Sequence, residues 1–339
     1  MDRYLLFCRL AGVATVFALV VVMLGAYVRL SNAGLGCPDW PGCYGHLTVP
    51  ESTHAMSQAT KTYPGRPVEP AKAWKEMVHR YFAGTLGLII AALLFISLTL
   101  RRVNAAGRYL PMALVVLVIF QALLGMWTVT LLLKPLIVMG HLLGGFATLA
   151  LLWWLFLSQR FPDLRASLRA VRMRTWVLLG LVILIAQIAL GGWTSSNYAA
   201  LACTDFPTCQ GQWWPHMDFR DAFVLWRGIG INYEYGVLTN PARTAIHVTH
   251  RIGALITITY LALLALRCVI FTRGWTFVAG WAVLVLVITQ FSLGVSNVVF
   301  HLPLPVAVAH NGTAALLLLS VLALLYGVTR PAEEKGGES

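Results

Sequence analysis

The stretch LGAYVRLSNAGLGCPDWPGC at residues 24–43 occurs a second time, as LGGWTSSNYAALACTDFPTC at residues 190–209. The two copies align without a gap, 166 residues apart, and each copy joins the end of an apolar run to a loop. Self-similarity of this kind indicates a duplicated structural unit. The identical residues are Leu24, Gly25, Ala33, Leu35, Cys37, Asp39, Pro41 and Cys43, each with the same residue in the second copy.

The duplication continues along the chain. At slightly different offsets His79-Arg80 pairs with His250-Arg251, Gln121-x-x-Leu-Gly125 pairs with Gln290-x-x-Leu-Gly294, and His141 pairs with His310. Short loop insertions would produce this small drift. We therefore expect two units, residues 1–158 and 174–330, joined by a linker at 159–173 and followed by a disordered tail at 331–339.

The composition indicates a membrane protein. Hydrophobic residues make up 58% of the chain and charged residues 11%, whereas about a quarter of the residues of a soluble domain are charged. A membrane span needs about 20 apolar residues. The eight runs of this kind cover 7–29, 75–99, 108–131, 138–158, 174–196, 243–270, 275–297 and 304–328.

These runs predict an all-α membrane protein with eight transmembrane helices, arranged as two tandem pseudo-symmetric four-helix bundles. The first run is too long for a signal peptide, and no small-residue cleavage site follows it, so we expect it to remain a helix. An even number of helices in each unit gives both units the same orientation. A pseudo-two-fold axis along the membrane normal should then relate them.

The net charge of +12 does not indicate nucleic-acid binding, because the basic residues flank apolar runs and form no stripe. The positive-inside rule explains the charge and predicts cytoplasmic N- and C-termini. The connections 30–74 and 197–242 then lie outside. The cytoplasmic basic residues would be Arg3, Arg9, Arg101, Arg102, Arg108, Arg160, Arg165, Arg169, Arg172, Arg174, Arg267, Arg273, Arg330 and Lys335.

The six cysteines agree with this orientation. Cys8 and Cys268 fall in apolar runs and should be inert packing residues. The other four form close pairs in the two outer connections, Cys37 with Cys43 and Cys203 with Cys209. Paired cysteines on the oxidising side of a membrane predict disulfides.

Four histidines, two from each unit, lie near the outer ends of predicted helices: His79, His141, His250 and His310. Ionisable residues in a bilayer are costly and indicate a functional site. Membrane cytochromes hold heme between imidazoles from two helices, so the pattern favours heme-iron ligation. Hydrogen bonding between helices is the alternative, and zinc is a weaker one. Glycines on the predicted helices would let a flat ring or a neighbouring helix approach: Gly25, Gly84, Gly125, Gly144, Gly145, Gly191, Gly192, Gly253, Gly294 and Gly312.

The two copies differ at one informative place, where the first has Glu76 and the second has His247. Glu76 precedes His79 by three residues, so both side chains share a helix face. A carboxylate there could take a proton or stabilise positive charge. An ion pair with Arg80 or Lys75 is the alternative interpretation. The role of His247 stays open.

Other polar residues receive weaker assignments. Arg80 and Arg251 suit heme propionates, because guanidinium matches carboxylate geometry, and Lys134 is a further candidate. The aromatic and charged segment 210–235 either lies on the membrane or covers a pocket. We expect no role beyond solvation for His46, His54, His216 and His301.

Together these motifs resemble the heme A synthase family over residues 7–328. The resemblance implies an oxidoreductase that oxidises the C8 methyl of heme O to a formyl group by successive hydroxylations, with water as the oxygen source. It also implies a role for each site residue. Glu76 would be catalytic, His79 and His141 would bracket heme O, His250 and His310 would ligate a permanent heme b, and Cys37 with Cys43 would form a structural or redox disulfide.

The resemblance further implies a multi-pass protein of the bacterial plasma membrane. Its partners would be the lipid bilayer, the farnesyltransferase that makes heme O, and cytochrome c oxidase assembly factors. It is compatible with a homo-oligomer.

Three alternatives stay open. A bis-histidine cytochrome b could carry electrons from quinol, and a transport or assembly factor could bind heme without chemistry. A thiol-disulfide enzyme is less favoured, because prolines stiffen the Cys37–Cys43 loop.

Overall fold

The structure is a computed structural model that describes residues 3–100, 103–164 and 167–329. Arg101, Arg102, Arg165, Arg330, Lys335, the side chain of Arg169 and the expected tail at 331–339 lie outside the described part. The described residues form helices and no named strand. The long helices are α1 (Arg3–Leu30), α3 (Pro70–Thr99), α4 (Ala105–Thr130), α5 (Pro135–Arg160), α7 (Arg174–Ser196), α9 (Asn240–Phe271), α10 (Trp275–Val299) and α11 (Leu304–Val328).

These eight helices are all long and apolar enough to cross a membrane. The eight spans predicted from the apolar runs are therefore confirmed, and the chain is a multi-pass membrane protein. Three short helices lie in the connections: α2 (Thr53–Thr62), α6 (Leu168–Val171) and α8 (Phe219–Ala222).

Three of the four helices that carry the histidines begin earlier than their apolar runs, and α11 begins at Leu304, where its run begins. α3 starts at Pro70 and α5 at Pro135, and α9 and α11 also have a proline in their first two positions. Proline is favoured at the first helical positions, because its fixed φ suits the helix and its missing N–H would be unpaired there. The histidines lie between six and ten residues after the first residue of their helices.

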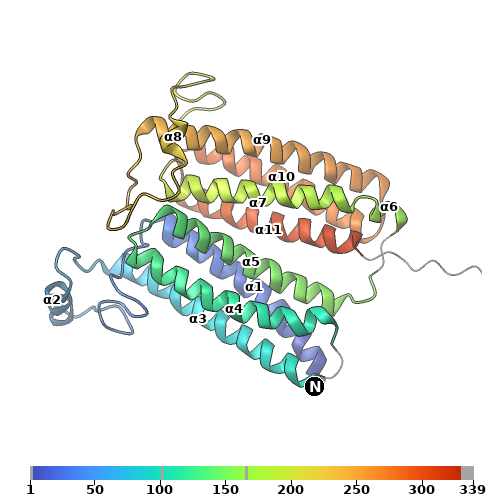
Figure 1. The fold of residues 1–339 in the computed structure, drawn as a ribbon, viewed down its shortest axis with the longest axis horizontal. Helices are drawn as coiled ribbons and strands as arrows, with labels where there is room; N and C mark the ends of the chain where they lie inside the picture. The colour runs from blue at the N-terminus through green and yellow to red at the C-terminus, as the bar shows by residue number, and fades with distance from the viewer. Residues whose placement is uncertain (1–2, 101–102, 165–166, 330–339) are drawn as a thin grey trace, which may run out of the picture.

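The long helices form two groups, α1 with α3, α4 and α5, and α7 with α9, α10 and α11 (Figure 1). In the first group, α1 and α4 each pack against both α3 and α5. In the second group, α7 and α10 each pack against both α9 and α11. The helices that carry the histidines are thus diagonal partners in each group, and their side chains can meet in the middle.

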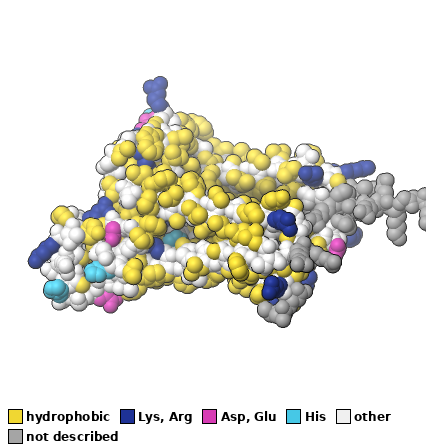
Figure 2. Space-filling model, turned by 60° about the horizontal axis from the view of Figure 1, so that its bottom comes forward, with side chains coloured by type: hydrophobic (Ala, Val, Ile, Leu, Met, Phe, Trp, Pro, Cys, Tyr) yellow, Lys and Arg dark blue, Asp and Glu magenta, His cyan; other side chains and the backbone are white. Residues whose placement is uncertain are grey.

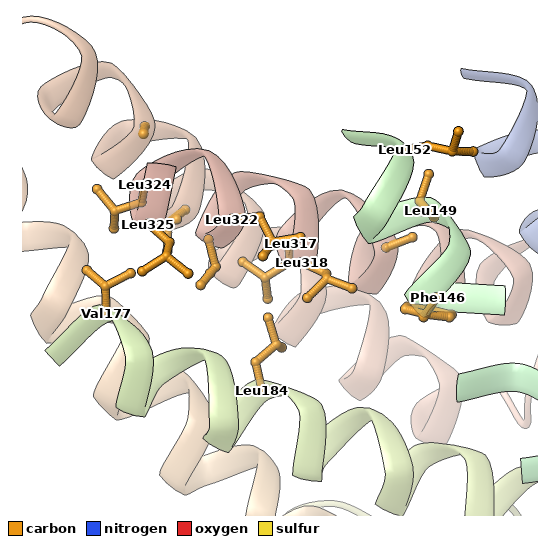
Figure 3. Packing of buried hydrophobic residues seen from close by; sticks show 14 of the residues in the cluster. Phe146, Leu149, Leu152, Val177, Leu184, Leu317, Leu318, Leu322, Leu324 and Leu325 are labelled. Carbon is orange, nitrogen blue, oxygen red and sulfur yellow. The ribbon is translucent and has the colours of Figure 1, made fainter. Parts of the chain in front are cut away.

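The two groups share one core. α1 packs on α11, and α5 packs on α7 and α11. Figure 3 shows buried side chains of α5, α7 and α11, among them Phe146, Leu184 and Leu318, which all belong to one buried cluster. Lipid is as apolar as leucine, so close packing supplies the stabilisation here. The shared core fixes the first group against the second.

On the face seen in Figure 2, hydrophobic side chains cover the middle of the molecule and lysines and arginines lie toward its two ends. Both long connections, with α2 and α8, lie at one end, which we call the loop end (Figure 1). The start of α1 and the short helix α6 lie at the opposite end. The two long connections thus share one side, as the sequence predicts.

Candidate functional site

A cavity of about 760 Å³ opens among the helices of the first group. It brings together four of the predicted site residues, Glu76, His79, Arg80 and His141. The second group completes its wall with Gly192, Ser195 and Asn311. The cavity is therefore built by both groups, although its candidate ligands come from the first.

His79 on α3 and His141 on α5 face each other inside this cavity. Their ring centroids are 6.5 Å apart and the ring planes are at 89°. The Nδ1 atoms of both rings are buried without a hydrogen-bond partner. Buried polar atoms are nearly always paired, so two orphaned imidazole nitrogens in one cavity indicate a site shaped for a ligand.

Glycines make the space for these rings. A Cβ atom on Gly25 would lie 3.1 Å from Cε1 of His79, and one on Gly125 would lie 3.5 Å from Cε1 of His141. The sequence predicted glycines that admit a flat ring or a neighbouring helix. In the structure, Gly25 and Gly125 each lie directly beside a histidine ring.

The second group repeats this arrangement. Gly191 and Gly294 would place Cβ atoms 3.3 Å and 3.2 Å from Cε1 of His250 and His310. Here glutamines approach the rings: Nε2 of Gln187 is 3.0 Å from Nδ1 of His250. Nε2 of Gln290 is 3.2 Å from Nε2 of His310. The two groups thus share the histidine and glycine framework, and Gln290 has its counterpart in Gln121 on the first cavity wall, whereas Gln187 has none.

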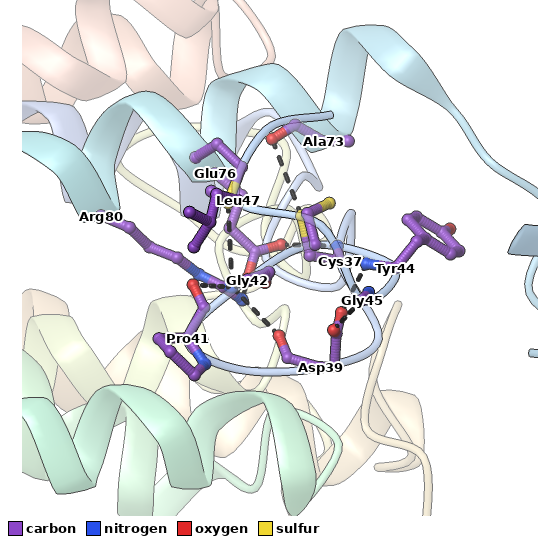
Figure 4. The surroundings of a disulfide bond; sticks show 12 residues. Cys37, Asp39, Pro41, Gly42, Tyr44, Gly45, Leu47, Ala73, Glu76 and Arg80 are labelled. Carbon is purple, nitrogen blue, oxygen red and sulfur yellow. Dashed lines mark hydrogen bonds and ion pairs between the residues drawn. A yellow bond between two sulfur atoms is a disulfide. The ribbon is translucent and has the colours of Figure 1, made fainter. Parts of the chain in front are cut away.

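Glu76 is buried, with 5% of its surface exposed. Its Oε1 accepts a hydrogen bond from Nη2 of Arg80 at 2.5 Å, and its Oε2 accepts one from the backbone N–H of Cys37 at 3.0 Å (Figure 4). The ion pair foreseen as the alternative interpretation is present. It leaves the carboxylate on the cavity wall beside His79, so the catalytic prediction stays open.

His247, the counterpart of Glu76, is also buried, at 4% exposure. Its Nδ1 lies 3.0 Å from the backbone carbonyl of Ala199. A carbonyl oxygen only accepts, so this nitrogen carries the proton and donates. His247 is therefore hydrogen-bonded to the loop after α7.

The two expected disulfides are present, with sulfur–sulfur distances of 2.03 Å for Cys37–Cys43 and 1.97 Å for Cys203–Cys209. Cys8 and Cys268 are free and buried, as expected for packing residues. Each disulfide closes a loop with a carboxylate at its centre. Asp205 accepts hydrogen bonds from the N–H groups of Gln210 and Gly211 and from the Thr208 hydroxyl, which lower the pKa of its carboxyl to about 2.

Arg80 and Arg251 both clamp these loops. Nη1 of Arg80 donates to the carbonyls of Asp39, Pro41 and Gly42. Arg251 donates to the carbonyls of Thr208, Cys203 and Asp205 at 2.8, 3.3 and 2.9 Å. Propionate binding by these arginines stays a prediction, and in the structure their donors serve the disulfide loops.

Lys134 also has protein partners. Its Nζ donates to the carbonyl of Gly228 and lies 3.2 Å from the ring centroid of Trp226. The backbone N–H of Tyr233 donates to the carbonyl of Leu132 at 3.0 Å. Residues 226–233 of the segment 210–235 therefore contact the connection between α4 and α5, and the two arrangements considered for the whole segment stay predictions. His46, His54, His216 and His301 are all exposed, as expected.

Sequence reasoning missed Arg29 and Gln187. Gln187 has no glutamine at the matching place in the first copy, so the repeat gave no signal for it. Arg29 lines the cavity, and its counterpart is Ser195. A search of the aligned copies for differences in charge would have found it.

The residues fit a heme better than a lone metal ion. Within the described part of the chain, no three histidine, cysteine or acidic side chains cluster as metal ligands would. What is present is a histidine pair in each group, with glycines beside the rings. These features define a class, the multi-pass membrane proteins that carry facing histidines on diagonal helices of a four-helix bundle, suited to a planar heme.

Comparison with known proteins gives the particular family. The model of the COX15-CtaA family, described as cytochrome oxidase assembly protein, matches residues 8–322, so the chain belongs to that family. A heme A synthase of Shewanella oneidensis is 49% identical over 320 residues, 94% of this chain and 95% of the relative. A heme A synthase of Caulobacter vibrioides is 29% identical, covering 94% of each chain.

Proposed function

We propose that this protein is a heme A synthase, an oxidoreductase that converts the C8 methyl of heme O to the formyl group of heme A. The carrying observation is the first-group cavity, in which a buried carboxylate lies one helical turn from one of two facing histidines. The second group has the histidines but places His247 where the carboxylate would be. The names of the relatives support the same activity.

In this proposal His79 and His141 bracket the substrate, and Glu76 acts on it. Hydroxylating a methyl group with water as the oxygen source releases two protons and two electrons at each step. Glu76 can accept a proton or stabilise developing positive charge next to the substrate. Its hydrogen bonds to Cys37 and Arg80 hold the carboxylate in place for that task.

The electrons need an outlet, and the second group can provide it. His250 and His310 would hold a permanent heme b, which supplies one-electron transfer when bound. Gly191 and Gly294 keep the space beside both rings open. The domain division then follows, with residues 1–158 as the substrate half, 174–330 as the heme b half and 159–173 as the linker.

The proposed setting is a bacterial plasma membrane, with both termini cytoplasmic and the loop end outside. Among the described residues, Arg160, Arg174 and Arg273 lie at or next to the helix ends away from the loop end, as expected of a cytoplasmic side under the positive-inside rule. The farnesyltransferase that forms heme O would supply the substrate, and cytochrome c oxidase assembly would use the product.

Mass analysis of the hemes extracted from the purified protein, expressed with a supply of heme O, tests this function. We expect heme b together with heme O, a hydroxylated derivative or heme A. Unmodified heme b alone would instead support the electron carrier or the transport factor. A Glu76→Ala variant that binds heme yet turns over normally would also refute the synthase.

A further inference from the structure

The two copies of the repeat also differ in charge at the end of α1. Arg29 occupies the position that Ser195 holds in the second copy, 166 residues later. Like Glu76, it is a charged residue of the first half with no equivalent charge in the second, and both residues line the cavity. The two differences in charge between the copies therefore meet at one site.

The second half holds Arg29 in place. Nη2 of Arg29 donates to the backbone carbonyl of Ser195 at 2.5 Å. Its guanidinium carbon lies 4.1 Å from the ring centroid of Tyr198, a cation–π contact. An arginine fixed on two sides keeps little rotamer freedom to lose when a ligand binds. Its orientation on the cavity wall is therefore set in advance.

Arg29 also has donors in reserve. A guanidinium carries five N–H donors, yet Nε of Arg29 is buried without a partner. Among the described residues no carboxylate lies within 4.0 Å of it, and Glu234 acts on it only from a longer distance. Arg80, the other arginine on the cavity, already serves Glu76 and three carbonyls. Arg29 is thus the cavity arginine able to receive an anion.

The position of Arg29 shows which part of a ligand it would meet. It follows Gly25 by four residues, so the two share a face of α1 about 6 Å apart along the axis. Gly25 abuts the ring of His79. Arg29 therefore lies one turn beyond the histidine pair, toward the loop end. A ligand held between the histidines could present carboxylates on one edge to it.

We propose that Arg29 binds a propionate carboxylate of the heme substrate, and that the second half contributes to substrate binding by holding Arg29 through Ser195 and Tyr198. This inference rests on the proposed function of the cavity. Guanidinium and carboxylate pair through two parallel charge-assisted hydrogen bonds. The pairing would turn the propionate edge of the substrate toward Arg29. The second half has Ser195 at the position of Arg29 and could not make this pairing.

The test compares two probes, iron protoporphyrin IX and its dimethyl ester, which lacks free carboxylates. Each is titrated into the purified full-length protein, as wild type and as Arg29→Gln, Arg29→Lys and, as a control at the other end of the same helix, Arg9→Gln. We expect Arg29→Gln to weaken binding of the free acid about tenfold or more, with little change for the ester. Arg29→Lys should keep part of the preference for the acid, and Arg9→Gln should behave as wild type.

Two outcomes would overturn the inference. The first is an Arg29→Gln variant that prefers the free acid as strongly as wild type does. The second is an equal loss of both probes that Arg29→Lys does not restore, which would assign Arg29 to packing between the halves alone. Heme A formation is measured in the same preparations. A wild type that makes no heme A would refute the proposed function, while the acid and ester titrations would still decide the role of Arg29.

Discussion

The carboxylate of Glu76 accepts a hydrogen bond from the backbone N–H of Cys37 at 3.0 Å. Cys37 is also half of the disulfide that closes the first outer loop. Arg80 completes the arrangement, because it binds the other oxygen of Glu76 and the carbonyls of that loop. The proposed catalytic carboxylate is therefore positioned by the loop and not by α3 alone.

Glu76→Gln should lower heme A formation about 100-fold or more, because general acid–base groups contribute this much. The amide oxygen of glutamine can still accept from the N–H of Cys37, whereas its NH2 group cannot accept from Arg80. Because Arg80 keeps its carbonyl partners in the outer loop, we expect the fold and the heme b content to be retained. Product analysis by mass spectrometry and the absorption spectrum of the purified variant check both points. His247→Gln is the matched control in the second half, and it should leave the rate near that of wild type. A Glu76→Gln variant with an unchanged rate would remove Glu76 from the mechanism.

Variants of the two histidine pairs should differ in whether the protein loses heme b or substrate binding. His250→Ala should abolish stable heme b, because one of the two proposed axial ligands is gone. His79→Ala should keep heme b and lose substrate binding. Heme content per protein, measured by absorption after purification, distinguishes the two variants. Loss of heme b in both variants, or in neither, would argue against the division between the halves.

Much of this architecture was predictable from local sequence. A run of about 20 apolar residues is recognisable as a transmembrane helix from the sequence alone. The repeat predicted matching depths for His79, His141, His250 and His310. Helix starts were predicted less well, because the apolar runs of α3, α5 and α9 begin after the proline turns.

Contacts that depend on how a helix is rotated were beyond the sequence. Nothing local shows that Gly25 faces His79, or that Arg80 on the cavity wall donates to the carbonyl of Gly42. The bond between Arg29 and Ser195 joins the two halves, so no short-range pattern contains it.

Asp205 should remain charged far into the acid range. Hydrogen bonds to its charged form hold its pKa at about 2, below the ordinary value of 3.8. A lowered pKa stabilises the folded loop above pH 3.8, and that contribution is lost as the pH falls toward 2. Acidification from pH 7 to pH 4 should therefore leave the second disulfide loop ordered.

Asp205→Asn mimics the protonated state at neutral pH. It should speed hydrogen exchange at the amides of Gln210 and Gly211, which the carboxylate binds. Asp39→Asn is the matched control, because Asp39 accepts the equivalent bonds from Tyr44 and Gly45 in the first loop. It should affect exchange in that loop only. A carboxyl of Asp205 that titrates near 3.8 by nuclear magnetic resonance would contradict this account.

Gly191→Ala should weaken heme b binding although alanine is the better helix former. Replacing a glycine inside a helix by alanine stabilises the helix by about 0.5–1 kcal/mol. At this position the new Cβ would lie 3.3 Å from Cε1 of His250, so the ring must shift. We expect an altered heme spectrum and faster loss of heme b to an acceptor protein.

Gly140→Ala provides the matched control, since its Cβ would meet only a methyl group of Leu124 at an ordinary 3.9 Å. That variant should gain thermal stability and keep the wild-type spectrum. Gly25→Ala crowds His79 at 3.1 Å and should affect substrate binding while heme b stays in place. If Gly191→Ala and Gly140→Ala lost heme b at the same rate, the glycines beside the histidines would serve helix packing alone.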